Sequence, residues 1–233
     1  MKKRIIITFV GVLALFSNPL CASEQYSISL DMGYGHNLTY GSFANFDLGA
    51  YMPLNTHFEM QANVRMSTAN TYAVGVQMRP KFALPVGEMY IEDRLLTNFI
   101  RRDKSLDFVH ALSVGYRMQY VNVQLGMTNR VMLPPTSDEV GDVFVCEPFD
   151  LLYRVEVYVR PATSVWNLSL ALANVDEYQI ERMWQPMFYL GGWYDIDEHW
   201  RISLNGKLKL AGMFHLNAHY YASEVRVGAE YKF

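Results

Sequence analysis

Hydrophobic and polar residues alternate along most of this chain with a period of two. Within residues 200–211, Trp200 and Ile202 fall on one side while Arg201 and Ser203 fall on the other. Successive side chains of a β-strand point to opposite faces, so this alternation predicts strands with one apolar and one polar face. The same pattern predicts about twelve strands, at residues 26–35, 43–54, 57–68, 71–83, 88–100, 106–118, 120–131, 149–160, 165–175, 183–194, 200–211 and 219–233.

The connections between these strands alternate in length. Tight turns are expected after every second strand, at residues 53–56, 84–87, 117–119, 161–164 and 195–198. The other connections tend to be longer and more polar, notably 131–148, 176–182 and 212–218. Short turns at one end, longer loops at the other and an even strand number are typical of transmembrane β-barrels of bacterial outer membranes. The pattern therefore predicts an all-β, up-and-down antiparallel barrel, with a soluble β-sandwich as the alternative fold.

The last predicted strand ends on an aromatic residue. Val225, Val227, Tyr231 and Phe233 share one face of it. This strand resembles the C-terminal signal strand of bacterial outer-membrane β-barrels, which the barrel-assembly machinery reads. The resemblance implies that Tyr231 and Phe233 act as an assembly signal and that the assembly machinery and outer-membrane lipids are the partners of this chain.

The first residues indicate export. Lys2, Lys3 and Arg4 precede an apolar run at 5–16 and a short exit at 18–23 of mostly small or polar residues. This is the organisation of a secretory signal peptide, and the run is shorter than the roughly 20 residues of a membrane-spanning helix. We expect residues 1–23 to be a cleaved signal peptide and residues 24–233 to form one outer-membrane barrel domain.

Composition narrows the function classes. Removing residues 1–23 leaves 17 basic against 23 acidic residues, so a nucleic-acid partner is not expected. About 210 residues suffice for one barrel. No internal repeat and no spacing of cofactor or metal ligands stands out, so we expect neither a cofactor nor a bound metal. The sequence does not determine the oligomeric state, and a monomer is the working expectation.

The polar faces of the predicted strands would line the lumen. The residues expected there are Glu59, Arg65, Arg79, Glu92, Arg94, Arg117, Arg154, Glu156, Arg201, Lys207, Lys209, Arg226 and Glu230. With Asp31, Asp47, Lys81, Arg130, Arg160, Glu224 and Lys232, they make thirteen basic and seven acidic residues. Charges in a lumen must be hydrated or paired, so this set predicts either a water-filled passage or a lumen closed by ion pairs. In an open lumen, the basic excess would favour small anions.

An enzyme is the competing function class. Outer-membrane lipid hydrolases place a catalytic His and Ser two residues apart on one strand, whereas His110 and Ser113 are three apart and should face opposite sides. Asp176, Glu177, His215 and His219 could approach an omptin-like protease arrangement at the outer rim, but no motif supports it. The expected function is therefore a narrow passive channel or a structural barrel. A lipid-modifying enzyme and an adhesive barrel remain as alternatives.

Several residues fit the barrel pattern badly. Asp93 and His110 fall on faces predicted to meet lipid, and we expect a bulge or a position near a rim to accommodate them. Acidic residues of the predicted loops should face the exterior and be solvated: Asp138, Glu139, Asp142, Glu147, Asp176, Glu177 and Glu181.

The run at 84–96 and the general organisation resemble uncharacterised outer-membrane barrel proteins of the Bacteroides type. The resemblance implies location and fold. It implies no catalytic or binding residue, because such barrels share architecture while their functions differ.

Overall fold

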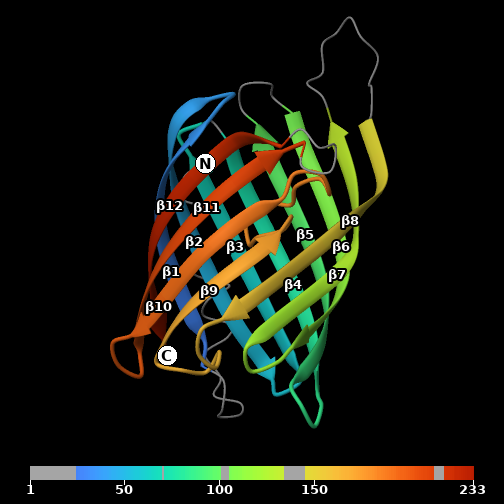
Figure 1. Ribbon diagram of the computed structural model, residues 1–233. Helices are drawn as coiled ribbons and strands as arrows, with labels where there is room; N and C mark the ends of the chain where they lie inside the picture. Colours follow the sequence, from blue (N-terminus) through green and yellow to red (C-terminus); the bar gives the residue numbers. More distant parts are fainter. Residues whose placement is uncertain (1–24, 70, 101–104, 134–144, 213–217) are drawn as a thin grey trace, which may run out of the picture.

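The chain folds into one closed ring of twelve antiparallel strands. In the computed structural model, residues 25–233 are described, except residues 70, 101–104, 134–144 and 213–217. Each strand pairs with its sequence neighbours, and β1 pairs with β12 to close the ring (Figure 1). The up-and-down barrel expected from the alternation is therefore confirmed. The predicted signal peptide at 1–23, most of the long loop with Asp138, Glu139 and Asp142, and His215 lie outside the described residues.

The strand bounds follow the predicted segments closely. The first six strands are β1 (Ser27–Asn37), β2 (Gly41–Asn55), β3 (Phe58–Ser67), β4 (Thr71–Ala83), β5 (Glu88–Ile100) and β6 (Ser105–Arg117). The other six are β7 (Val121–Leu133), β8 (Val145–Tyr158), β9 (Trp166–Ala173), β10 (Met187–Asp195), β11 (Trp200–Ala211) and β12 (His219–Lys232). The largest differences are a β8 that begins earlier and a β10 that begins later than expected. None of the described residues forms a helix that is long and apolar enough to cross a membrane.

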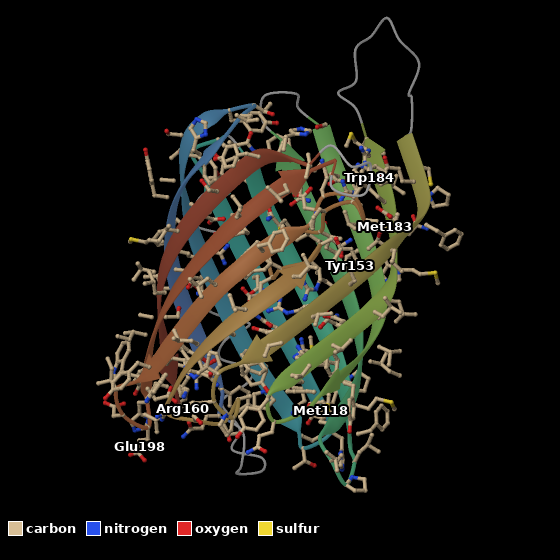
Figure 2. All side chains as sticks on the ribbon, viewed as in Figure 1. Met118, Tyr153, Arg160, Met183, Trp184 and Glu198 are labelled. Carbon is tan, nitrogen blue, oxygen red and sulfur yellow. The ribbon has the colours of Figure 1, made fainter. Side chains whose placement is uncertain are left out.

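The two ends of the barrel differ. Ser27 pairs with Lys232, so β1 begins where β12 ends. We call this the turn end, because it carries connections such as 56–57 and 118–120. The opposite end, which we call the loop end, carries the connections 38–40 and 174–186. Figure 2 labels Met118, Arg160 and Glu198 near the turn end, and Met183 and Trp184 near the loop end.

The distribution of apolar and polar side chains is the reverse of that in a soluble protein. Apolar side chains on the outer face are largely exposed, including Val76, Leu125 and Leu204. Charged side chains such as Asp47 and Glu92 are buried inside the ring. A continuous exposed apolar surface is stable only against another apolar phase, and closure leaves no strand edge unpaired in it. This arrangement fits a barrel that crosses a membrane.

The wall between β8 and β9 is the weakest part of the ladder. Only five residue pairs join these strands, from Arg154–Ala173 to Tyr158–Ser169. On the loop-end side of these pairs, the side chain of Asn174 continues the hydrogen bonding to β8. Its Oδ1 accepts the N–H of Tyr153 at 2.8 Å, and its Nδ2 donates to the carbonyl oxygen of Leu151 at 2.7 Å. The segment that follows β9 therefore takes the place of a strand beside the upper half of β8.

Candidate functional site: the plugged lumen

The connection 174–186 between β9 and β10 folds into the lumen, and we call it the plug loop. Asn174, Val175, Asp176, Tyr178 and Ile180 are each at most 5% exposed. Val175 and Ile180 form an antiparallel bridge that turns the loop back on itself. The expectation that Asp176 and Glu181 face the exterior was therefore wrong: Asp176 is buried, and Glu181 pairs with the lumen residue Lys209. Glu177 remains solvated, with its side chain 52% exposed, and lies 3.8 Å from Arg226. The polar residues of the loop did not by themselves indicate the inward path, because a polar loop segment can be solvated by water outside or by charges inside.

One side of the plug loop is held by apolar packing. Val175 and Ile180 pack against inward-facing side chains of β4, β5, β6, β8 and β9: Ala73, Leu96, Val109, Ala111, Leu152 and Ala173. We call this set the inner core. The signal was present in the sequence, because these inward positions are apolar where the rest of the inward face is polar. An apolar patch inside a barrel lumen needs a cover, and the plug loop supplies it.

The other side of the plug loop is held by charges through Asp176. Its Oδ2 lies 3.2 Å from Lys207 Nζ and 4.0 Å from Arg226 Nη2. Its Oδ1 accepts the backbone N–H groups of Tyr178 and Gln179, both at 2.8 Å, which fixes the tight turn. Arg94 donates to the backbone carbonyl oxygen of Asp176. One side chain thus shapes the loop and anchors it to the wall.

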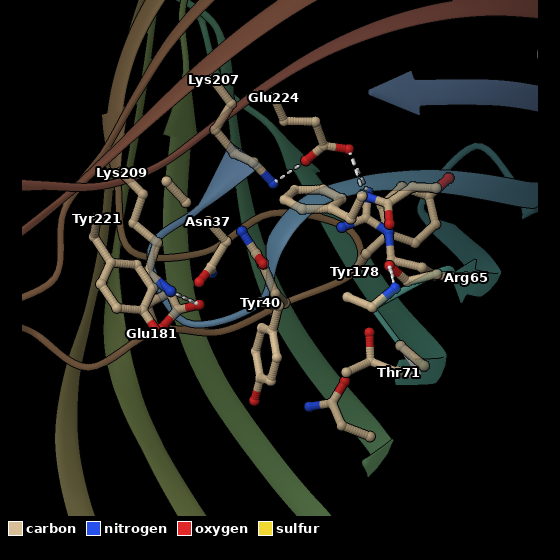
Figure 3. Close-up of a pocket in the computed structure, with 18 of the residues that line it drawn as sticks. Asn37, Tyr40, Arg65, Thr71, Tyr178, Glu181, Lys207, Lys209, Tyr221 and Glu224 are labelled. Carbon is tan, nitrogen blue, oxygen red and sulfur yellow. Dashed lines mark hydrogen bonds and ion pairs between the residues drawn. The ribbon is translucent and has the colours of Figure 1, made fainter. Parts of the chain in front are cut away.

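Tyr178 occupies the centre of the lumen. The guanidinium groups of Arg65 and Arg226 both lie over its ring, 4.5 and 5.1 Å from the centroid. A cavity of about 290 Å³ lies on its loop-end side, bordered by Asn37, Lys209 and Tyr221 (Figure 3). A second cavity of about 310 Å³ lies toward the turn end and is lined by Ser27, Glu230 and again Tyr178. Tyr178 and its two arginines therefore separate two polar vestibules.

The structure places the predicted lumen-lining residues on the inward side, where each contacts an opposite charge. Glu59, Glu92, Arg79 and Arg94 form one group, with Arg79 lying 2.5 Å from Glu59 and 2.7 Å from Glu92. The remaining predicted residues are paired as follows: Arg65 with Asp47, Arg226 with Asp47 and Glu224, Lys207 with Glu224, Lys209 with Glu181, Arg154 with Glu156, Arg201 with Asp195 and Glu230, and Arg117 with Glu88.

The expected positive excess of the lumen is largely cancelled. Six acids that the sequence analysis did not place there contact predicted bases: Glu88, Asp107, Asp176, Glu177, Glu181 and Asp195. Arg160, which was expected inside, is exposed and stacks at 3.8 Å on the ring of Trp166. The sequence analysis underestimated the acids because the plug loop supplies three of them, Asp176, Glu177 and Glu181, from outside the strand pattern.

The two aromatic residues proposed as an assembly signal lie at the turn end. The ring of Tyr231 is 4.9 Å from that of Trp200 and 5.1 Å from that of Phe233, in edge-on geometry. Phe233 is 61% exposed. Rings in this position suit the headgroup level of a membrane.

The candidate enzymatic groups are not brought together. Ser113 is 3% exposed inside the barrel, whereas the His110 side chain is 55% exposed on the outer face. His219 is exposed at the start of β12, while Asp176 is buried beneath it in the lumen. Within the described part of the chain, no three His, Cys, Asp or Glu side chains are placed to hold a metal ion.

The expected surroundings of Asp93 and His110 were wrong. Neither residue is at a rim, and no register shift interrupts β5 where Asp93 lies. Instead, His110 Nε2 lies 2.8 Å from Asp93 Oδ1. Asp93 and His110 therefore satisfy each other's hydrogen bonding across β5 and β6. Alternation within one strand does not predict such a contact between neighbouring strands.

Comparison with known proteins finds structural likeness only. No family model matches the chain, and no curated protein matches it in sequence. The NanC porin shares 10% identity at a TM-score of 0.54, over 88% of this chain and 100% of the porin. The translocator domain of the autotransporter NalP from Neisseria meningitidis shares 11% identity at a TM-score of 0.57, over 100% of this chain and 95% of the translocator domain. The Acinetobacter baumannii outer membrane protein Omp33 shares 10% identity at a TM-score of 0.50, over 90% of this chain and 99% of Omp33. The fold is therefore that of bacterial outer-membrane β-barrels.

Proposed function

We propose that the mature chain is an outer-membrane barrel that provides a narrow passive passage for small polar solutes, with the plug loop as its constriction. The observation that carries this is the pair of polar vestibules that meet at Tyr178. Polar cavities on both sides of one ring are what a water-filled path through a barrel of this size requires. The apolar outer face and the likeness to a porin support the location, and the turn end would then face the periplasm.

The constriction limits solutes by size more than by charge. Arg65, Arg226 and Lys207 pair with Asp47, Asp176, Glu177 and Glu224 around Tyr178. Because these bases are paired with acids, the constriction carries no excess of positive charge. The anion preference expected from the sequence is therefore not part of the proposal. A strongly selective pore would need an excess of one sign.

A sealed structural barrel is the second candidate, and the inner core favours it. Val175 is 1% and Ile180 3% exposed, so the plug loop is packed against the wall. Loops fixed this way do not swing aside readily, because moving them exposes apolar surface. We also propose that the protein is not an enzyme, which the opposite orientation of His110 and Ser113 supports.

Single-channel recording of the refolded mature chain tests the passage. We expect small discrete conductance steps from the unchanged protein and larger ones from Tyr178→Ala, because the two vestibules then join. Tyr34→Ala, on the outer face and 65% exposed, is the matched control and should conduct as the unchanged protein does.

Each result of this recording decides between the two candidates. Steps only from Tyr178→Ala would mean that the native barrel is sealed, and would replace the passage with the structural barrel. Silence from both, in protein whose gel migration shifts on heating as a folded barrel's does, would reject the passage.

A further inference from the structure

Four polar side chains interrupt the apolar outer face on three neighbouring strands. They are Asp93 and Thr97 on β5, His110 on β6 and Asn129 on β7, and we call them the outer polar cluster. At comparable mid-strand positions elsewhere, the outer face carries apolar side chains such as Met32, Val76 and Leu204. The cluster is therefore a local departure from the pattern that the rest of the wall follows.

The cluster retains unused hydrogen-bonding capacity. His110 Nε2 and Asp93 Oδ1 share one hydrogen bond at 2.8 Å, which leaves Nδ1 of His110 and Oδ2 of Asp93 open. His110 is the direct cross-strand partner of Asn129. Within the described residues, neither Asn129 nor Thr97 forms a side-chain hydrogen bond. The cluster thus presents both donors and acceptors outward.

Asp93 and His110 of the cluster lie at the middle of the wall. Asp93 and His110 are each the sixth residue of a 13-residue strand. Tyr116 of β6 lies toward the turn end, and the stacked rings of Tyr72 and Phe99 lie toward the loop end, with centroids 6.3 Å apart. Aromatic rings mark the headgroup levels of a barrel, so Asp93 and His110 face the hydrocarbon between them. Polar groups in hydrocarbon raise the free energy of the barrel unless something pairs with them.

The chemistry of the cluster identifies what could cover it. Acyl chains offer no hydrogen-bonding group, and lipid esters and water lie at the headgroup level. A membrane-embedded protein surface remains. Asp93 accepts, Asn129 and Thr97 both donate and accept, and His110 can do either through Nδ1, so two such clusters are complementary to each other. Two copies inserted in the same direction also hold their clusters at the same depth.

We propose that the outer face of β5–β7 is a dimer interface, through which two copies of this chain pair their outer polar clusters about a two-fold axis along the membrane normal. Leu95, Leu112 and Met127 surround the cluster, each more than half exposed, and supply the apolar contacts of the interface. Each copy presents the same patch, as an isologous contact requires. The inference rests on the membrane location proposed above and is independent of the passage. It departs from the monomer expected from the sequence.

Disulfide cross-linking in vesicles tests this interface. Cys146 is the one free cysteine among the described residues and is exposed, so it is first changed to serine. In that background, Leu112→Cys lies at the proposed interface, and Leu204→Cys, on β11 and 58% exposed, is the matched control. We expect an oxidised dimer from Leu112→Cys and none from Leu204→Cys at the same protein-to-lipid ratio. Equal cross-linking of both, or none of either, would overturn the proposal.

A second measurement asks whether the polar groups drive pairing. Subunit counting by single-molecule photobleaching in vesicles should find dimers of the unchanged chain. The double change Asp93→Leu with His110→Leu should raise the dissociation constant about tenfold or more, because it removes the polar contacts that hold the two copies together in the membrane. Its gel migration should still shift on heating, which shows that the barrel folds. Monomers of the unchanged chain at every ratio, or an unaltered constant in the double variant, would contradict the interface.

Cross-linking in cells separates a second copy from another partner. If Leu112→Cys captures a different membrane protein and not itself, self-pairing is overturned. These measurements do not depend on conductance. A folded protein that does not conduct would reject the proposed passage without affecting the dimer, and a monomeric protein that conducts would reject the dimer without affecting the passage.

Discussion

Arg65 and Asp47 face each other across the β2–β3 pair and form two parallel hydrogen bonds, Nε to Oδ1 at 2.8 Å and Nη2 to Oδ2 at 2.7 Å. The side chain of Asp47 is fully shielded and that of Arg65 is 8% exposed. The same guanidinium group stacks on Tyr178. One arginine therefore links the barrel wall to the constriction.

Changing Arg65 to Met should lower the free energy of unfolding by about 3 kcal/mol, because it leaves a buried carboxylate short of its main partner. Urea unfolding of the folded barrel in lipid vesicles measures this. The double change with Asp47→Leu should recover much of the loss, since it removes both charges together. Arg160→Met, at an exposed site, should cost less than about 1 kcal/mol. A double variant no more stable than Arg65→Met would refute this account.

Changing Ile180 to Ala should loosen the plug loop by about 2–4 kcal/mol, because it leaves a cavity in the inner core. The measurement is the rate of proteolysis within 174–186 in the folded barrel, which should rise by at least an order of magnitude. Ile180→Val keeps most of the packing and should change the rate far less. Unchanged cleavage in Ile180→Ala would show that charges alone hold the loop.

The two roles of Asp176 can be separated by two substitutions. Asp176→Asn keeps an oxygen for the N–H groups of Tyr178 and Gln179 but removes the charge beside Lys207. Asp176→Ala removes both. We expect hydrogen exchange at the Tyr178 amide to accelerate moderately in the first variant and by a further tenfold or so in the second, the loss of a capping oxygen contributing about 1 kcal/mol. Equal rates in both variants would mean that the charge alone anchors the turn.

The β10–β11 turn should respond to acid only at low pH. The Asp197 carboxylate accepts the N–H groups of Trp200 and His199 at 2.7 and 2.8 Å, and these bonds hold its pKa below the usual 3.8. A depressed pKa contributes stability that is complete above the ordinary value and is lost as the pH falls through the lower one. Carbon NMR titration of Asp197 should therefore show a midpoint below 3.8. In Asp197→Asn, the turn should keep its hydrogen bonds and lose this pH dependence. A midpoint at or above the ordinary value would contradict the turn geometry.

The sequence by itself determined the barrel, since alternation with a period of two fixes which side chains face which side of each strand. Glu59 and Arg226 could be assigned to the inner face from their neighbours in the chain alone. The alternate turn lengths then gave the antiparallel order. These features are local, so no knowledge of distant contacts was required.

Only the tertiary structure decided what fills the barrel and what meets across strands. The path of the plug loop depends on Val175 and Ile180 reaching Leu96 and Val109, residues distant in the chain. The Asp93–His110 pair likewise depends on the register between β5 and β6. Alternation predicts which face of the sheet each side chain lies on, but it predicts neither the cross-strand partner of that side chain nor its depth in the membrane. A loop has no such periodicity, so its path cannot be predicted in this way. The constriction at Tyr178 and the arrangement of the outer polar cluster therefore follow only from the tertiary structure.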